Sequence, residues 1–150
     1  MSEFAFTKEV VGTIAIPLSF TQVDICDILV GAIEGGINYW GTVVGYTNTL
    51  LSKEDLRDVI LRETILPIVY NKPNDEPIST WVAHLILQGN VVYFADIEDL
   101  TDISALTLEN LMEGIRLNQN RRGNSTYEDY DATDYDCIMQ YAMFGRVVYG

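Results

Sequence analysis

The chain has 150 residues, 48% of them hydrophobic, and a formal net charge of −13 from nine basic and 22 acidic residues. Length and apolar content favour a single domain over residues 1–150 with its own core and argue against disorder. So acidic a surface repels DNA or RNA as a long partner. No apolar run is long enough to span a membrane, and residues 1–6 lack a signal-peptide pattern, so we expect no membrane partner.

The first third of the chain predicts a strand, a helix and a second strand. Apolar β-branched residues predict the first strand over residues 8–16. Thr21 and Asp24 have the spacing of a capping box, and apolar residues then recur at helical spacing up to Gly35 and Gly36. We expect the two glycines to end this helix and reverse the chain into a strand over residues 37–46.

The middle third is less regular. Ser52 is a good N-cap for a helix over residues 53–62, and residues 65–70 predict a short strand weakened by Pro67. Residues 79–88 have the apolar spacing of a helix, which we favour over a strand. Residues 91–97 are nearly all apolar, which is typical of a strand buried on both faces.

The last third predicts two helices. One begins after Thr107 and ends near Gly123, and an acidic, polar loop follows over residues 123–131. The second begins at Thr133 and ends at Gly145, ahead of a short extended piece. Helices interleaved with three or four strands predict an α+β fold in which a small, mainly antiparallel sheet packs against several helices.

Two acidic clusters raise the question of a metal site. The first follows the buried strand and contains Asp96, Glu98, Asp99 and Asp102. It lacks the glycine of an EF-hand loop and has no nearby histidine, so a solvated turn is favoured over a metal site. The second is favoured as a solvated face with a helix N-terminus; it contains Glu128, Asp129, Asp131, Asp134 and Asp136. We expect no metal and no cofactor.

The sequence gives little support to an enzyme. His84 is the single histidine and lies among apolar residues, which favours a core or edge histidine over a catalytic base. No nucleophile elbow, phosphate-binding loop or dinucleotide-binding glycine pattern occurs. Cys26 and Cys137 lie within amphipathic helical patterns and are expected to be reduced core residues. We therefore expect a protein without a catalytic site.

Arginines and aromatic residues are the remaining candidates for a site. Arg116, Arg121 and Arg122 lie close together at the end of one predicted helix, in a chain with few basic residues. They either compensate the helix dipole or capture phosphate oxygens. Tyr39 and Trp40 are adjacent on a predicted strand and should face opposite ways, one into the core and one toward the arginines. Aromatic rings beside arginines suit a purine nucleotide.

Several segments resemble the first anti-Thoeris family of bacteriophage proteins, which sequester glycocyclic ADP-ribose signals. The resemblance covers residues 21–150 and is carried by Gly35-Gly36-Ile37-Asn38-Tyr39-Trp40, Phe94-Ala95-Asp96, Leu106-Thr107, Glu113-Gly114-Ile115 and Gln140-Tyr141-Ala142-Met143-Phe144-Gly145. It implies an α+β homo-oligomer, a dimer or a hexamer, in the cytoplasm of the infected bacterial host. It also implies a pocket between two protomers that holds a small cyclic nucleotide without cleaving it.

The same resemblance assigns roles to residues. Phe94 falls on the aromatic position that stacks on adenine, with Tyr39 or Trp40 in support, and Ser104 stands near the position of a family asparagine. Arg121 and Arg122 would hold the diphosphate, with Arg116 as a weaker candidate. This hypothesis of a nucleotide sponge has two alternatives. One is an acidic phage protein that binds a basic host protein, and the other is a metal-dependent nucleotide hydrolase that uses Asp96, Glu98 and Asp99.

Overall fold

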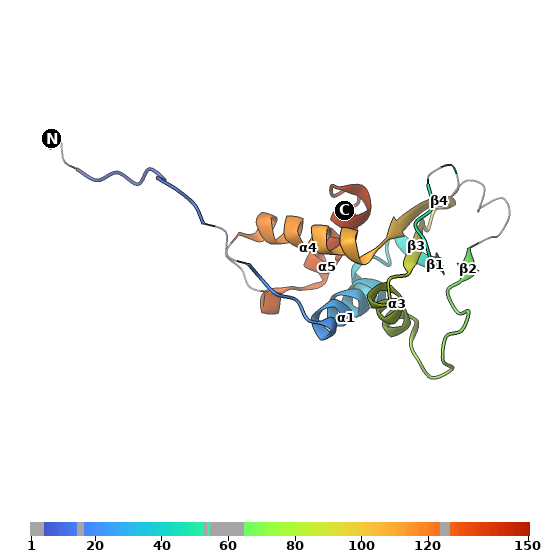
Figure 1. The fold of residues 1–150 in the computed structure, drawn as a ribbon. Coiled ribbons are helices and arrows are strands. Elements are labelled where there is room, and N and C mark those ends of the chain that lie inside the picture. Colours follow the sequence, from blue (N-terminus) through green and yellow to red (C-terminus); the bar gives the residue numbers. More distant parts are fainter. Residues whose placement is uncertain (1–4, 15–16, 53, 55–64, 124–126) are drawn as a thin grey trace.

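A computed structural model describes residues 5–14, 17–52, 54, 65–123 and 127–150. Over these residues the fold is α+β, as the sequence predicts, with a four-stranded antiparallel sheet packed against helices (Figure 1). The helices are α1 (Gln22–Gly31), α3 (Ile78–Leu87), α4 (Leu108–Arg122) and α5 (Ala132–Phe144). The strands are β1 (Gly41–Thr47), β2 (Leu66–Pro67), β3 (Val91–Asp96) and β4 (Asp99–Leu106).

The sheet has the strand order β2-β1-β3-β4, and every neighbouring pair is antiparallel. The predicted buried strand is confirmed as β3, whose first five residues are all buried. Strand β4 was not predicted, because its first half reads as an acidic turn. It is an edge strand whose first four residues are exposed, so its sequence lacks the apolar pattern that predicts a buried strand.

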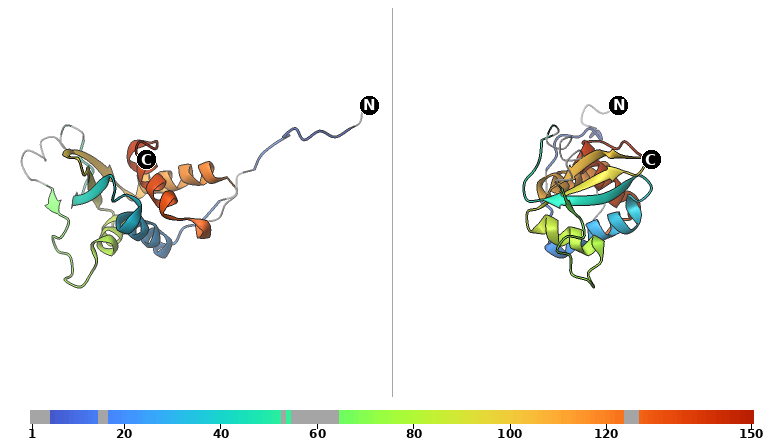
Figure 2. Two further views of the ribbon diagram at one scale, coloured as in Figure 1. Left: turned by 180° about the vertical axis from the view of Figure 1, so that it is seen from behind. Right: turned by 90° about the vertical axis from the view of Figure 1, so that its right-hand side faces the viewer.

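The predicted first strand is wrong over residues 8–14, which form no regular element, while residues 15–16 lie outside the described residues. The segment runs away from the body of the molecule (Figures 1 and 2). A strand requires a neighbouring strand for its backbone hydrogen bonds, and this segment has none in the described part of its own chain. Residue type alone therefore did not produce a strand here.

The predicted capping box at the start of α1 is confirmed, since Thr21 and Asp24 each bond the other's backbone N–H. The helix then widens into a π-helical turn (Ala32–Gly36). A Cβ on Gly36 would lie 3.2 Å from the Ala132 carbonyl oxygen of α5, so this glycine permits close packing. Residues 37–40 form a turn rather than the start of a strand, and β1 begins only at Gly41.

The three elements predicted in the middle of the chain differ in how well they match the structure. The helix expected over residues 79–88 is confirmed as α3, which packs against α1. The strand expected over residues 65–70 is reduced to β2, two residues long and containing Pro67 at the sheet edge. The helix expected over residues 53–62 lies outside the described residues except for Glu54, which is helical.

Helices α4 and α5 pack side by side and extend away from the sheet (Figure 1). Gly114 allows this approach, because a Cβ there would collide with the Ile138 carbonyl and with Ala142. Helix α5 begins at Ala132, one residue earlier than predicted, because Asp131 rather than Thr133 supplies the cap. No helix in the described part of the chain is both long and apolar enough to cross a membrane.

Candidate functional site

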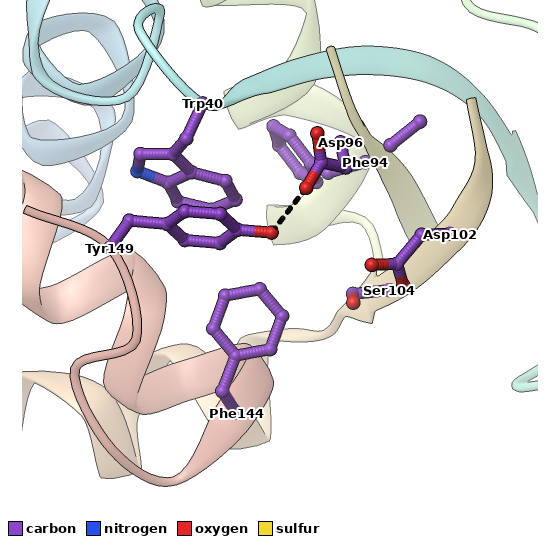
Figure 3. Close-up of a pocket in the computed structure, with 8 residues that line it drawn as sticks. Trp40, Phe94, Asp96, Asp102, Ser104, Phe144 and Tyr149 are labelled. Carbon is purple, nitrogen blue, oxygen red and sulfur yellow. Dashed lines mark hydrogen bonds between the residues drawn. The ribbon is translucent and has the colours of Figure 1, made fainter. Parts of the chain in front are cut away.

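A shallow hollow, partly open to solvent, lies where the sheet meets the end of α5, and the space that it encloses is about 10 Å³. Its lining comes from four places far apart in the sequence: the turn before β1, the end of β3, the middle of β4 and the C-terminal segment after α5. The lining residues are Trp40, Phe94, Ala95, Asp96, Asp102, Ser104, Phe144 and Tyr149. The rings of Tyr149 and Phe144 lie on one side, and Asp102 and Ser104 lie on the other (Figure 3).

Aromatic rings form one wall of the hollow. The Trp40 and Tyr149 rings are stacked, with centroids 4.8 Å apart and an interplanar angle of 4°. Phe144 is tilted against both, 5.5 Å from Trp40 and 5.9 Å from Tyr149. Trp40 is 4% exposed and Phe94 1% exposed, so both belong to the core. The ring faces that a bound group could reach are therefore those of Tyr149 and Phe144.

Two carboxylates form the opposite side. The Tyr149 hydroxyl donates to Asp96 Oδ2 at 2.5 Å, and the Glu98 backbone N–H donates to Asp96 Oδ1 at 2.7 Å. The bond from Tyr149 lowers the pKa of Asp96, and the same bond is the main reason that the pKa of Tyr149 rises to about 12. Asp102 bonds no group in the described part of the chain, so its exposed carboxylate remains available to a ligand.

Asp136 of α5 holds the aromatic wall in place from behind. It accepts hydrogen bonds from Tyr39 Oη at 2.6 Å, Trp40 Nε1 at 2.8 Å and Gln140 Nε2 at 2.8 Å. The buried Gln140 also accepts from the backbone N–H groups of Val148 and Tyr149, at 2.7 Å each. One carboxylate thus joins the turn before β1 to the segment that carries Tyr149.

Tyr39 and Trp40 divide into one exposed and one buried ring, as expected. Tyr39 is 50% exposed and donates to Asp136 of α5, and the expectation that its ring faces the arginines stays a prediction. Burial, and then the bond to Asp136, raise the pKa of Tyr39 to about 12. The division arises in a turn, not from the alternation of a strand.

Arg121 and Arg122 are held by the buried side chain of Asp134. Arg121 Nη2 lies 3.0 Å from Asp134 Oδ1, and Arg122 Nη1 lies 2.7 Å from Asp134 Oδ2. Arg121 Nη2 also donates to the buried Asn118 side chain at 2.9 Å. Asp134 is 0% exposed, so the expectation of a solvated acidic face is wrong at this residue. The pair of arginines is first of all a structural clamp between α4 and α5.

Asp134 is ionised within this clamp. Burial opposes its charge, but the Asp131 backbone N–H, the Asn118 amide and Arg122 all donate to it, and together they lower its pKa. Arg116 lies on the outer surface of α4, where it pairs with Glu113. Each of the three arginines therefore already has a carboxylate partner.

The hollow brings together three of the seven residues predicted as ligand contacts: Trp40, Phe94 and Ser104. The arginines do not line it. Helix α4 starts directly after β4 and rises about 1.5 Å per residue, so Arg121 lies roughly 20 Å along the helix axis from the sheet. A single copy of the chain thus keeps the rings and the arginines apart.

The hollow's most useful residues were missed as ligand contacts. Asp102 was considered only as a metal ligand, and Tyr149 only as part of a terminal extended piece. Phe144 was named only within a segment that carries the family resemblance. Nothing local in the sequence marks these positions, because the wall forms only when the C-terminal segment folds back onto Trp40.

The predicted acidic turn is confirmed at residues 96–99, where carboxylates serve the backbone. Asp96 and Asp99 accept from the N–H groups of Glu98 and Thr101 within the hairpin. No group of three or more acidic, histidine or cysteine side chains in the described part of the chain is placed to hold a metal ion. Exposed His84 pairs with Glu76 at 3.1 Å, at the edge of the fold.

Both cysteines are free, as expected, with Cys137 buried and Cys26 half-buried. Burial is the main reason that the pKa values of both thiols are raised. A thiol with a raised pKa is a poor nucleophile, because the thiolate is the reactive form. Neither cysteine suggests a catalytic centre.

Comparison with known protein families, with curated protein sequences and with solved structures finds no match to this chain. The resemblance to the anti-Thoeris family thus rests on the sequence segments that carry it.

Proposed function

We propose that this protein acts by binding rather than catalysis, and that its hollow receives a basic side chain of a protein partner. One observation carries the proposal: two carboxylates and two reachable ring faces converge at one hollow on a chain of net charge −13. The arginines that would suit an anionic ligand are held elsewhere by Asp134.

Size argues against enclosure of a whole nucleotide. Pockets that enclose a drug-sized ligand measure about 300–1,000 Å³, whereas this hollow encloses about 10 Å³, so a partner's side chain would lie across it rather than inside it. Charge points the same way. Asp96 and Asp102 both line the hollow, and a phosphate placed beside them would be repelled at short range.

The geometry suits a guanidinium group in particular. A planar guanidinium can lie on the face of Tyr149 or Phe144 while its N–H groups donate to Asp102. A cation–π contact of about 0.5–2 kcal/mol and a charge-assisted hydrogen bond of about 1.5–3 kcal/mol give at most about 5 kcal/mol, so one side chain would bind no tighter than about 0.2 mM. A protein partner would add contacts around it.

The test is an NMR titration of the ¹⁵N-labelled protein with the peptide Ac-Gly-Arg-Gly-NH₂. We expect the amide signals of residues 102–104 and 149 to shift, and the citrulline peptide, which has no charge, to leave them in place. Asp102→Asn should weaken the interaction about tenfold, through loss of a charge-assisted bond. Asp75→Asn is the matched control, because it removes the same charge from an exposed loop away from the hollow. Equal weakening by both variants would mean that the peptide is attracted non-specifically by the acidic surface, and it would contradict the proposal.

A second candidate is the nucleotide sponge that the resemblance implies. It is favoured by the gathering of Trp40, Phe94 and Ser104 at one hollow that is too small to enclose a nucleotide alone. A second protomer would have to complete the pocket and bring its own arginines to it. Calorimetry with glycocyclic ADP-ribose tests this candidate: saturable heat without ligand breakdown supports it, and no heat at high protein concentration rejects it.

A further inference from the structure

The segment of residues 5–14, here called the N-terminal arm, exposes more apolar surface than any comparable stretch of the described chain. Phe6 and Val11 are 103% exposed, Ile14 is 86% exposed and Val10 is 75% exposed. Residues of this type are normally buried, and a run of them in water marks an interaction site. The arm lies at the opposite end of the molecule from the sheet (Figure 1 and the left view of Figure 2).

The sheet offers the complementary feature. Strand β4 is the last strand in the order β2-β1-β3-β4, so its outer edge has no strand beside it in the described part of the fold. It is eight residues long and carries exposed Leu100. Unpaired N–H and C=O groups on such an edge are a template for another strand.

We propose that the N-terminal arm pairs as a β-strand with the β4 edge of a second copy of the chain. The β-branched composition that predicted a strand over residues 8–16 is then correct for the assembly, although the strand is absent from the single chain. Seven residues, 8–14, match the eight residues of β4 in length.

Charge selects the same occupant. Two copies of so acidic a chain repel each other, so a contact between them needs a local positive group. The arm carries Lys8 and Glu9, which face opposite sides of a strand, so Lys8 can lie beside Asp99 or Asp102 of β4 while Glu9 points away. When two copies exchange arms, each contact occurs twice, and the interface is closed and self-complementary.

The proposal uses the backbone edge of β4 and, among the side chains that it invokes, shares only Asp102 with the hollow, so a failure of the arginine peptide to bind would leave it standing. It is tested on the full chain by light scattering over a range of concentrations, with hydrogen exchange of the arm amides. We expect a particle of at least twice the 16.9 kDa chain mass, and arm amides that are protected at high concentration and unprotected on dilution.

Two single proline variants at adjacent positions make the test specific. Successive N–H groups of a strand point to opposite edges, so only one of Val10→Pro and Val11→Pro removes a hydrogen bond to the partner. That variant should weaken self-association about tenfold and the other much less. The fold should be unaffected in both, as judged by circular dichroism, because both side chains are exposed.

Three results would overturn the proposal. The parent chain could remain at 16.9 kDa at every concentration. Both proline variants could associate as the parent does. The arm amides could be protected in the dilute monomer, which would mean that the arm folds back onto its own chain.

Discussion

Replacement of Asp134 by asparagine tests the claim that Arg121 and Arg122 are a clamp rather than a free phosphate site. The substitution keeps the shape of the side chain and removes its charge. Breaking a buried ion pair costs about 3–5 kcal/mol, because it leaves charges without partners. The side chain of Arg121 is 38% exposed and that of Arg122 19%, so solvent recovers part of this cost. We therefore expect a loss near the lower limit, about 3 kcal/mol.

That loss is measurable by urea unfolding followed by circular dichroism at pH 7. With domains stable by about 5–15 kcal/mol, 3 kcal/mol moves the midpoint far without unfolding the protein. Glu113→Gln is the matched control on α4, the helix that carries the arginines. It breaks the exposed pair with Arg116, and the midpoint should stay where it is.

The stability that ionised Asp134 contributes should also depend on pH in a defined direction. The folded protein lowers the pKa of Asp134 below its ordinary value of 3.8, so the ionised carboxylate contributes stability above that pH. This contribution is lost as the pH falls through the lower, folded pKa. The difference between parent and Asp134→Asn should therefore be full at pH 7 and shrink in acid. A loss under about 1 kcal/mol at pH 7, or a difference that does not vary with pH, would refute the clamp.

Three further predictions concern the scaffold of the hollow. Gly36→Ala should destabilise the fold, by about 1–3 kcal/mol, because the added Cβ would press on the Ala132 carbonyl, whereas Gly35→Ala meets nothing within 4 Å and should be neutral or slightly stabilising in thermal unfolding. Asp136→Ala should cost about 2–4 kcal/mol, because Trp40 Nε1 loses its partner and Gln140 Nε2 keeps only the Tyr149 carbonyl. A variant as stable as the parent in urea would contradict this role of Asp136. Ultraviolet titration should show Tyr149 ionising near pH 12 instead of near its ordinary pKa of 10.0. The stability that the Tyr149 hydroxyl contributes should therefore be complete below pH 10 and be lost between pH 10 and 12. Ionisation of every tyrosine near pH 10 would contradict this assignment.

The helices were predictable because their signals are local. Thr21 and Asp24 form a capping box within four residues, and Thr107 caps α4 in the same way with Asn110. The apolar spacing of α3 and α4 also lies within one element, so it can be read from the chain directly. The starts of α3 and α5 each lie one residue earlier than predicted, and at α5 the reason is that Asp131 supplies the cap.

Strands were harder because a strand depends on a partner. The arm has strand-forming residues but no neighbouring strand, whereas the acidic β4 is a strand because it pairs with β3. A sequence pattern indicates whether a segment can form a strand, but whether it does so depends on which other segment pairs with it. The same limit explains β2, where Pro67 is tolerated because the strand is short and at the edge.

The site was the least predictable part, because it depends on pairs far apart in the chain. Nothing in the sequence shows that Asp134 lies between two arginines, and the acidic run around it reads as a solvated face. Gathering of Trp40, Phe94 and Ser104 at one hollow was anticipated only through the resemblance. The carboxylates beside them change the chemistry expected there from an anionic ligand to a basic one.

The central claim is that the hollow selects a basic side chain over a nucleotide. It is tested most directly by adding Ac-Gly-Arg-Gly-NH₂ and glycocyclic ADP-ribose separately to the same ¹⁵N-labelled protein. We predict that the arginine peptide shifts the amides of residues 102–104 and 149, and that Asp102→Asn removes most of this response. Tight binding of the nucleotide at these same residues, with no response to the peptide, would contradict the claim.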